Sequence, residues 1–216
     1  MKKDIYKSLG PILKWVFISL STIIIILFIS FIVVRFLHYK KLDKDQKQIE
    51  IIHSTKINLA DVLGENLPKQ PENPNQTIAG VDINKNGIRD DVELYIFEKY
   101  PDSAKTRSAL LQYAQVWQMI MTQDFNHEEV ATEIAREDSR ADACLADTIS
   151  PRESPESFRD YAELLKIDEY ISFLEKIQFN TEQRAKVKED FYTKVRSFSD
   201  IEEKDRCDID YSLLAN

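Results

Sequence analysis

"SAKTRSALLQYAQVWQMIMTQ", Ser103 to Gln123, decides the fold of this chain. Its apolar residues recur at the i, i+3, i+4, i+7 and i+11 spacing of one helix face. They are Leu110, Tyr113, Ala114, Trp117 and Met121. Asp102 or Ser103 can cap the first turn. An aromatic stripe at helical spacing is typical of a packed helix face, so we predict a core helix rather than a cofactor site.

Helical patterns continue on both sides of this stretch. They cover Val92–Tyr100, His127–Asp147, Glu156–Gln178 and Glu182–Phe198. The apolar faces of the second and third are Val130, Ile134, Ala141, Cys144 and Leu145, then Phe158, Tyr161, Leu165, Ile171 and Leu174. With only 4 Gly in 216 residues, a fold rich in tight β-turns is disfavoured. We therefore predict an all-α domain of four or five helices packed around one core.

The N-terminal region contains "WVFISLSTIIIILFISFIVV", Trp15 to Val34, which has no charged residue. At about 1.5 Å per residue it spans about 30 Å, the thickness of a bilayer's hydrocarbon core. A cleaved signal peptide would have a shorter apolar run followed by small residues, and none follow here. A buried core helix is the other alternative, but it is rarely so uniformly rich in Ile. We predict an uncleaved transmembrane signal-anchor at 15–34 that binds the lipid bilayer.

The predicted division of the chain follows from this anchor. Residues 1–14 form a cytoplasmic tail, 35–79 a charged stalk and proline-rich linker, and 80–216 the helical domain. The linker includes "LPKQPENPNQT", which holds three prolines. Basic residues flank both ends of the anchor in nearly equal numbers, so flanking charge alone does not set the orientation.

The stretch "GVDINKNGIRDDVELYI", Gly80 to Ile96, joins the linker to the first helix. Counting from Asp82, it matches the calcium-loop pattern Asp-x-Asp/Asn-x-Asp/Asn-Gly-x₅-Glu at every specified position. Calcium takes six to eight oxygens, so oxygen-bearing side chains at alternate positions can converge on it, while Gly87 permits the sharp turn. The predicted ligands are Asp82, Asn84, Asn86, the Ile88 carbonyl, Asp90 and Glu93.

This stretch resembles an EF-hand loop, and it is more similar to dockerin-like and thrombospondin type 3-like loops of extracellular proteins. Two departures from the EF-hand favour the latter. The residues before Asp82 do not form an entering helix, and position 8, usually apolar, is Arg89. The resemblance covers about 15 residues and implies a calcium site, not a family for the whole chain.

A turn followed by a capped helix is the alternative interpretation of the loop. Asn86-Gly87 is a turn signal, and Asp90-x-x-Glu93 matches a capping box. Neither device requires Asp82 or Asn84. Three acids and two amides predict weak binding, about 10⁻⁴–10⁻³ M, as in extracellular modules. We therefore expect a structural Ca²⁺ on the extracytoplasmic side; a calcium sensor would need a paired loop, which the sequence lacks.

Two cysteines, Cys144 and Cys207, are present. In an exported domain an even count suggests a disulfide, here one tying the C-terminal tail to the third predicted helix. Two free thiols, with Cys144 in the core, are the alternative. Disulfide and weak calcium site together favour a domain in the periplasm, anchored in the inner (cytoplasmic) membrane by a single pass.

The charge balance limits the functions to consider. Subtracting the five basic residues and one acid of 1–38 from totals of 29 and 37 leaves 24 and 36 in residues 39–216, a net charge of about −12. This excludes nucleic acid as a partner and favours a cation or a basic protein surface. Acid pairs such as Glu137/Asp138 are interpreted as solvated helix faces, and His38, His53 and His127 as scattered.

No catalytic constellation is visible in the sequence. His127-Glu128 lacks the second His of a zinc-protease pattern, and no phosphate loop or nucleophile elbow occurs. We predict a non-enzymatic, membrane-anchored protein-interaction module of a bacterial cell envelope with an unidentified protein partner. The alternative is an anchored envelope hydrolase that uses acidic residues.

Overall fold

The computed structural model describes residues 2–154, 157–198 and 206–214, with side chains from Leu13 onward. Every regular element in these residues is helical, which confirms the predicted all-α fold class. The helices are α1 (Lys2–Ser54), α2 (Leu59–Leu63), α3 (Asp90–Lys99), α4 (Ala104–Thr122), α5 (Glu128–Ile149), α6 (Tyr161–Gln178), α7 (Glu182–Tyr192) and the 3-10 turn η2 (Tyr211–Leu213). The chain divides into two compact units, Met1–Lys47 and Gln48–Asn216.

The first unit is the greater part of α1. Its stretch from Leu13 has a mean hydropathy of 2.9 in its most apolar window, and none of that window is buried within the protein. Apolar side chains such as Ile24 (58% exposed) and Phe28 (63%) have no protein core to pack against. This helix is long and apolar enough to cross a membrane, as predicted for 15–34. The predicted tail 1–14 is also helical from Lys2; the side chains of residues 1–12 lie outside the described part.

The second unit begins well before the predicted domain start at residue 80. Ile52 at the end of α1, Ile57, and Val62 in α2 are all buried in the hydrophobic core. The C-terminal part of the expected stalk and linker is therefore part of the folded domain. Sequence pattern missed this because its apolar residues are spread over a bend and two short elements, so they show no sustained period.

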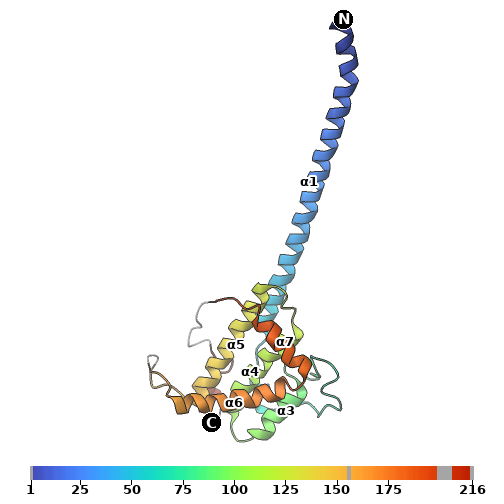
Figure 1. Cartoon of the computed structure of the whole chain (residues 1–216). Helices are drawn as coiled ribbons and strands as arrows, with labels where there is room; N and C mark the ends of the chain where they lie inside the picture. Colours follow the sequence, from blue (N-terminus) through green and yellow to red (C-terminus); the bar gives the residue numbers. More distant parts are fainter. Residues whose placement is uncertain (1, 155–156, 199–205, 215–216) are drawn as a thin grey trace. The chain divides into compact units, whose positions relative to one another are not determined.

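Helix α4 is the centre of the domain and contacts α2, α3, α5, α6 and α7 (Figure 1). Ser103 caps it through the Thr106 amide. The predicted face is buried at Leu110, Tyr113, Ala114 and Trp117, but burial extends around the whole helix. Its polar residues therefore face neighbouring segments: Gln112, Gln115 and Gln118 donate to the backbone carbonyls of Arg206, Asn86 and Ala79.

The proline-rich segment is held by an arginine more than a hundred residues later in the chain. Arg184 of α7 is fully buried. Its guanidinium donates to the carbonyls of Pro74, Thr77 and Ile78 and to the side chain of Asn75. A fifth bond goes to Asn180. All five guanidinium donors are thus satisfied, which turns an apparent linker into an ordered surface loop.

Helix α6 differs from its prediction. It starts at Tyr161, where an Asp160–Glu163 capping box opens it, rather than at Glu156, which lies outside the described residues. Of the predicted apolar face, Leu174 is buried and Ile171 partly so. Phe158, just before the helix, and Tyr161 and Leu165 at its start are 97%, 76% and 46% exposed, and the first buried residue of α6 is Ile167.

Helix α5 carries the disulfide. Its apolar residues Val130, Ile134, Ala141, Cys144 and Leu145 are buried, as predicted. Cys144 is bonded to Cys207, with their Cα atoms 5.1 Å apart, which confirms the predicted link between this helix and the C-terminal tail. The alternative of two free thiols is excluded by this pairing.

Candidate metal centre

The loop from Gly80 to Glu93 is shaped by left-handed backbone positions and fixed by α4. Lys85, at φ 59°, and Gly87, at φ 79°, lie in the left-handed region. Because glycine has no Cβ, the backbone at Gly87 adopts this conformation without strain. Gln115 of α4 donates to the Asn86 carbonyl at 2.7 Å. The Asp90 amide donates to the Val81 carbonyl at 2.8 Å, which closes the loop at its base.

The predicted ligand side chains converge inside this loop. Glu93 accepts hydrogen bonds from the amide groups of Asn84 and Asn86, each at 3.0 Å. Asp82 Oδ2 accepts from the Gly87 amide at 3.1 Å, and Asp90 Oδ1 from the Ile83 amide at 3.0 Å. Positions 3, 5 and 12 of the loop thus touch one another, and both aspartates turn an oxygen toward the loop backbone.

The capping-box alternative is not formed. Helix α3 begins at Asp90, and its N-cap, Arg89, makes no side-chain capping bond. The Asp90 carboxylate bonds to Ile83, which lies seven residues earlier, and not to the Glu93 amide. Asp90 and Glu93 therefore take part in loop contacts that a capped helix does not require.

Two oxygens in the loop are left without a partner. Asp82 Oδ1 and Asp90 Oδ2 are buried, and no hydrogen bond reaches either one from the described residues. Asp90 itself is 0% exposed. A buried carboxylate oxygen without a donor costs about 1–3 kcal/mol or more, so native proteins almost always pair such an atom with a donor or a cation. The residues present therefore fit a cation bound between these carboxylates.

The acids of the loop repel one another. Burial raises the pKa of Glu93 to about 7; hydrogen bonds from Asn84 and Asn86 oppose the rise, and the charges of Asp61 and Asp90 add to it. Burial, with smaller contributions from the charges of Asp82 and Asp91, also raises the pKa of Asp90, against the Ile83 hydrogen bond. Within the described residues no ion pair reaches Asp82, Asp90 or Glu93, so the protein supplies amides but no cationic side chain here.

Residues 88 and 89 anchor the loop to the domain. Ile88 is fully buried in the core, and its amide donates to Asn86 Oδ1 at 3.0 Å. Arg89, also fully buried, bonds to Asp91 and to the carbonyls of Ile177 and Gln178 at the end of α6. The departure from the EF-hand pattern at position 8 thus has a physical reason: this residue docks on α6 instead of pairing with a sister loop.

A grouping of three or more His, Cys, Asp or Glu side chains suited to a metal is absent from the described part of the chain. The loop is a mixed set in which Asn84 and Asn86 separate the carboxylates. Calcium differs from zinc in using amide and backbone carbonyl oxygens alongside carboxylates. The residue types of the loop therefore suit a calcium-type ligand shell, which differs from a cluster of acids and histidines.

Sequence analysis missed a second segment beside the loop. The Asn84 side chain donates to the carbonyl of Asn66 at 3.1 Å. Asp61 of α2 is buried, and it lines a cavity of about 560 Å³ together with Asp82 and Asn86. No local signal could reveal this, because Asp61 precedes the loop by a long proline-containing segment whose path depends on Arg184.

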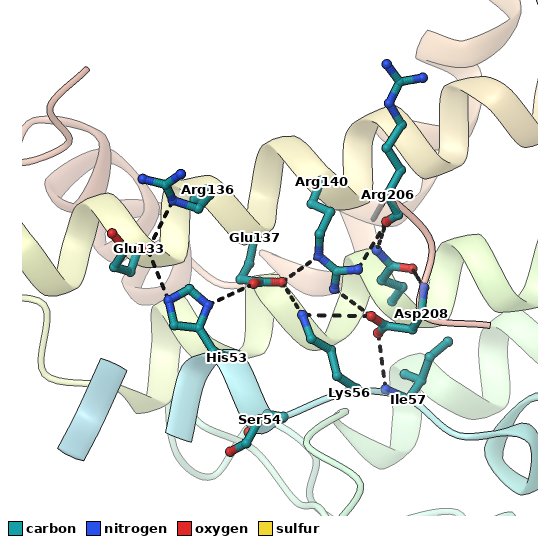
Figure 2. Close-up of polar contacts among 12 residues, drawn as sticks. His53, Ser54, Lys56, Ile57, Glu133, Arg136, Glu137, Arg140, Arg206 and Asp208 are labelled. Atoms are coloured by element: carbon teal, nitrogen blue, oxygen red, sulfur yellow. Dashed lines mark hydrogen bonds and ion pairs between the residues drawn. The ribbon is translucent and has the colours of Figure 1, made fainter. Parts of the chain in front are cut away.

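A polar network lies between the end of α1, α5 and the C-terminal tail (Figure 2). Glu137 of α5 pairs with Lys56 at 2.6 Å and with Arg140 at 2.7 Å. Arg140 also pairs with Asp208 at 2.6 Å. His53 lies within 3.1 Å of Glu133 and 3.3 Å of Glu137. The interpretation of Glu137 as a solvated acid is wrong, since it is 5% exposed.

The neighbouring acid Asp138 is not simply solvated either. It accepts hydrogen bonds from Trp117 at 2.9 Å and from Tyr192 at 2.8 Å. These bonds place it against the aromatic side of the core, where a solvated helix face was expected. The sequence showed only that both acids lie on one helix, and their partners come from distant segments.

Comparison with known proteins adds no assignment: no family model matches the chain, and no curated protein or solved structure is similar to it.

Proposed function

We propose that this chain is a single-pass membrane protein of the cell envelope whose helical domain is braced by a structural Ca²⁺ and binds a protein partner. The observation that carries the proposal is the pair of buried, partnerless oxygens on Asp82 and Asp90 in a loop that matches the calcium pattern. When bound, calcium supplies the positive charge that these carboxylates lack.

Six residues would hold the ion. Asp82, Asp90 and Glu93 would bring negative charge. The side-chain oxygens of Asn84 and Asn86 and the backbone carbonyl of Ile88 would complete the ligand set. Because the loop is fixed to α4 through Gln115 and to α6 through Arg89, the ion's role is to brace the junction between the proline-rich segment and α3. This is a structural role, with no catalytic step assigned to it.

The disulfide and the proposed weak calcium site support the location in this proposal. Disulfides persist in oxidising compartments, and a site of about 10⁻⁴–10⁻³ M fills only where calcium is abundant. The Cys144–Cys207 bond therefore supports a domain in the periplasm, with α1 anchored in the inner membrane and the N-terminus in the cytoplasm.

The start of α6 and the residues just before it support the partner-binding part of the proposal. Phe158, which precedes the helix, and Tyr161, Leu164 and Leu165 in its first five residues are between 46% and 97% exposed. Exposed apolar side chains that lie close together in the chain are typical of interaction sites. Nearby positive charges are used internally, since Arg159 bonds to Asp147 and Lys166 to the Ile149 carbonyl. The acidic domain and this apolar face suit a partner with apolar and basic residues, and crosslinking in intact membranes followed by a Tyr161→Glu comparison tests it.

Calorimetric titration of the full-length protein in detergent micelles tests the calcium site. The titrant is CaCl₂ up to about 10 mM, after removal of metals with a chelator. We expect saturable binding and, for a dissociation constant near 1 mM, a stabilisation of about 1.4 kcal/mol at 10 mM. Asp90→Asn should abolish both, whereas the exposed control Asp190→Asn should retain both. Absence of binding by the unmodified protein at 10 mM would reject the calcium site.

An anchored hydrolase remains the second candidate only if a cleft with two acids of raised pKa exists. Glu93 and Asp90 also have raised pKa values, but the proposal assigns them to the calcium loop. Outside the loop, burial raises the pKa of Asp138, to about 6, and that of Asp142. However, both Asp138 oxygens are engaged by Trp117 and Tyr192, as expected of a packing role. We therefore favour a non-enzymatic module.

A further inference from the structure

The segment from Asn58 to Asn66 approaches the loop from outside the calcium pattern. Asp61 is 5% exposed and is held in place by a reciprocal cap: its amide donates to Asn58 Oδ1 at 3.1 Å, and its Oδ2 accepts from the Asn58 amide at 2.9 Å. The capping box therefore fixes a fourth carboxylate in one orientation near the loop. The cap uses one of its oxygens, Oδ2.

One hydrogen bond and one shared cavity wall link this segment to the predicted ligands. The Asn66 carbonyl accepts from Asn84, which itself bonds to Glu93. Asp61 shares the wall of the 560 Å³ cavity with Asp82 and Asn86. Asp61 is thus close enough for its charge to act on the loop.

We propose that the cation site extends beyond the loop: Asp61 strengthens the binding of a divalent cation, and the bound ion fastens the Asn58–Asn66 segment to the loop at Asp82–Glu93. This inference rests on the proposed calcium site, for which the fully buried Asp90, with its partnerless Oδ2, is the independent observation. The ion then joins the two ends of the proline-containing surface loop that Arg184 holds in the middle.

The physical reason is the charge count. Calcium affinity in such loops is set largely by the number of negative charges and by the rigidity of the site. The loop brings three charges and Asp61 a fourth, already oriented by its cap. A negative charge about 6–8 Å from a divalent ion changes its affinity by about five- to tenfold even when the interaction is screened at the dielectric constant of water.

Calorimetric calcium titration of full-length variants in detergent micelles tests the inference. Asp61→Asn keeps an oxygen for the Asn58 amide and removes only the charge, so the dissociation constant should rise about five- to tenfold. Glu65→Gln is the matched control, because it removes one charge from the exposed neighbour and should change affinity less than twofold. Asp61→Glu, which keeps the charge, should restore most of the affinity. Unfolding in chelator checks that each variant is folded.

Hydrogen exchange supplies a second measurement. Calcium should slow amide exchange in residues 58–66 of the unmodified protein, and much less in Asp61→Asn at the same calcium concentration. If the unmodified protein binds calcium while Asp61→Asn has the same affinity, or if Glu65→Gln weakens binding equally, the inference is overturned and the proposed calcium site stands. If the unmodified protein binds no calcium, both fall.

Discussion

The loop at Asp82–Glu93 and the network around Glu137 are both buried and acidic, but their charges are balanced differently. Glu93 is 1% exposed and Glu137 is 5% exposed. Burial raises the pKa of Glu93 to about 7. Burial would raise the pKa of Glu137 too, but the charges of Arg140 and Lys56 outweigh it and leave that pKa below its ordinary value. The two glutamates differ in their partners, not in their depth.

The partners explain what each region needs. In the network, Lys56 and Arg140 lie against Glu137 and Asp208 (Figure 2), so the protein neutralises its own buried acids. In the loop, Glu93 is met by two neutral amides, and two aspartate oxygens are met by none. This difference supports the proposal that the loop binds a cation from solution, and the substitutions below test the difference in charge balance.

Removing the positive charge of Arg140 from the network around Glu137 should have the largest effect. Arg140→Met strands Glu137 and Asp208 with less positive charge and leaves the Arg206 carbonyl without this donor. We expect a loss of about 3–5 kcal/mol in the free energy of unfolding, as for other buried pairs broken on one side. Urea unfolding of the full-length protein in detergent micelles, followed by near-ultraviolet circular dichroism, measures it.

The control for this substitution is Arg196→Met. Arg196 pairs with Glu128, but both side chains are largely exposed. We expect a change within about 1 kcal/mol, because solvent screens exposed ion pairs. Equal losses in the two variants would show that the network around Glu137 is no better balanced than an ordinary surface pair.

The same chemical change should lower stability at Glu137 but not at Glu93. In chelator near pH 8, Glu137→Gln removes a charge that faces Lys56 and Arg140, and should lower stability by about 2 kcal/mol. Glu93→Gln removes a charge that faces only amides and other acids, and should leave stability unchanged or raise it by about 1 kcal/mol. Urea unfolding measures both. A loss of similar size in both variants would contradict the proposed difference in charge balance.

Sequence analysis reached the parts of this comparison that depend on local pattern. Helical spacing predicted the core helix around Trp117, and composition predicted the apolar span of α1. The cysteine count predicted the Cys144–Cys207 pair. The candidate loop ligands stay a prediction, chosen because calcium chemistry fixes their spacing over a dozen residues. The burial of Glu137 and Asp61 could not be predicted, because the residues around each come from distant parts of the chain.

The Arg184 contacts were likewise not predictable from local sequence. Prolines and amides between Leu67 and Thr77 predict an unattached linker by composition alone. The buried guanidinium of Arg184 donates four hydrogen bonds to the stretch from Pro74 to Ile78 and makes it part of the domain. Exposure of the first half of α6 is a further case, since apolar spacing predicts a face but not whether anything covers it.

The last prediction concerns Asp138, which adjoins Glu137 on α5 but accepts hydrogen bonds from neutral donors. Burial raises its pKa to about 6, while hydrogen bonds from Tyr192 and Trp117 and the charge of Lys188 oppose the rise and Asp142 adds to it. Since the folded pKa exceeds the unfolded value of 3.8, the folded state holds the proton more tightly. Its contribution to stability is fully present below about pH 3.8 and is lost as pH rises through about 6.

Asp138→Asn should therefore stabilise the protein near pH 7, where the native carboxylate is ionised, by about 1–2 kcal/mol after allowance for its partial exposure. The advantage should shrink as pH falls from about 6 toward 4. Glu137 titrates in the opposite sense: with a lowered pKa, it stabilises the fold above about pH 4.5 and loses this effect below. Urea unfolding of Asp138→Asn and Glu137→Gln between pH 4 and 8 separates the two. Parallel pH profiles for these adjacent acids would show that their different partners do not control their charge.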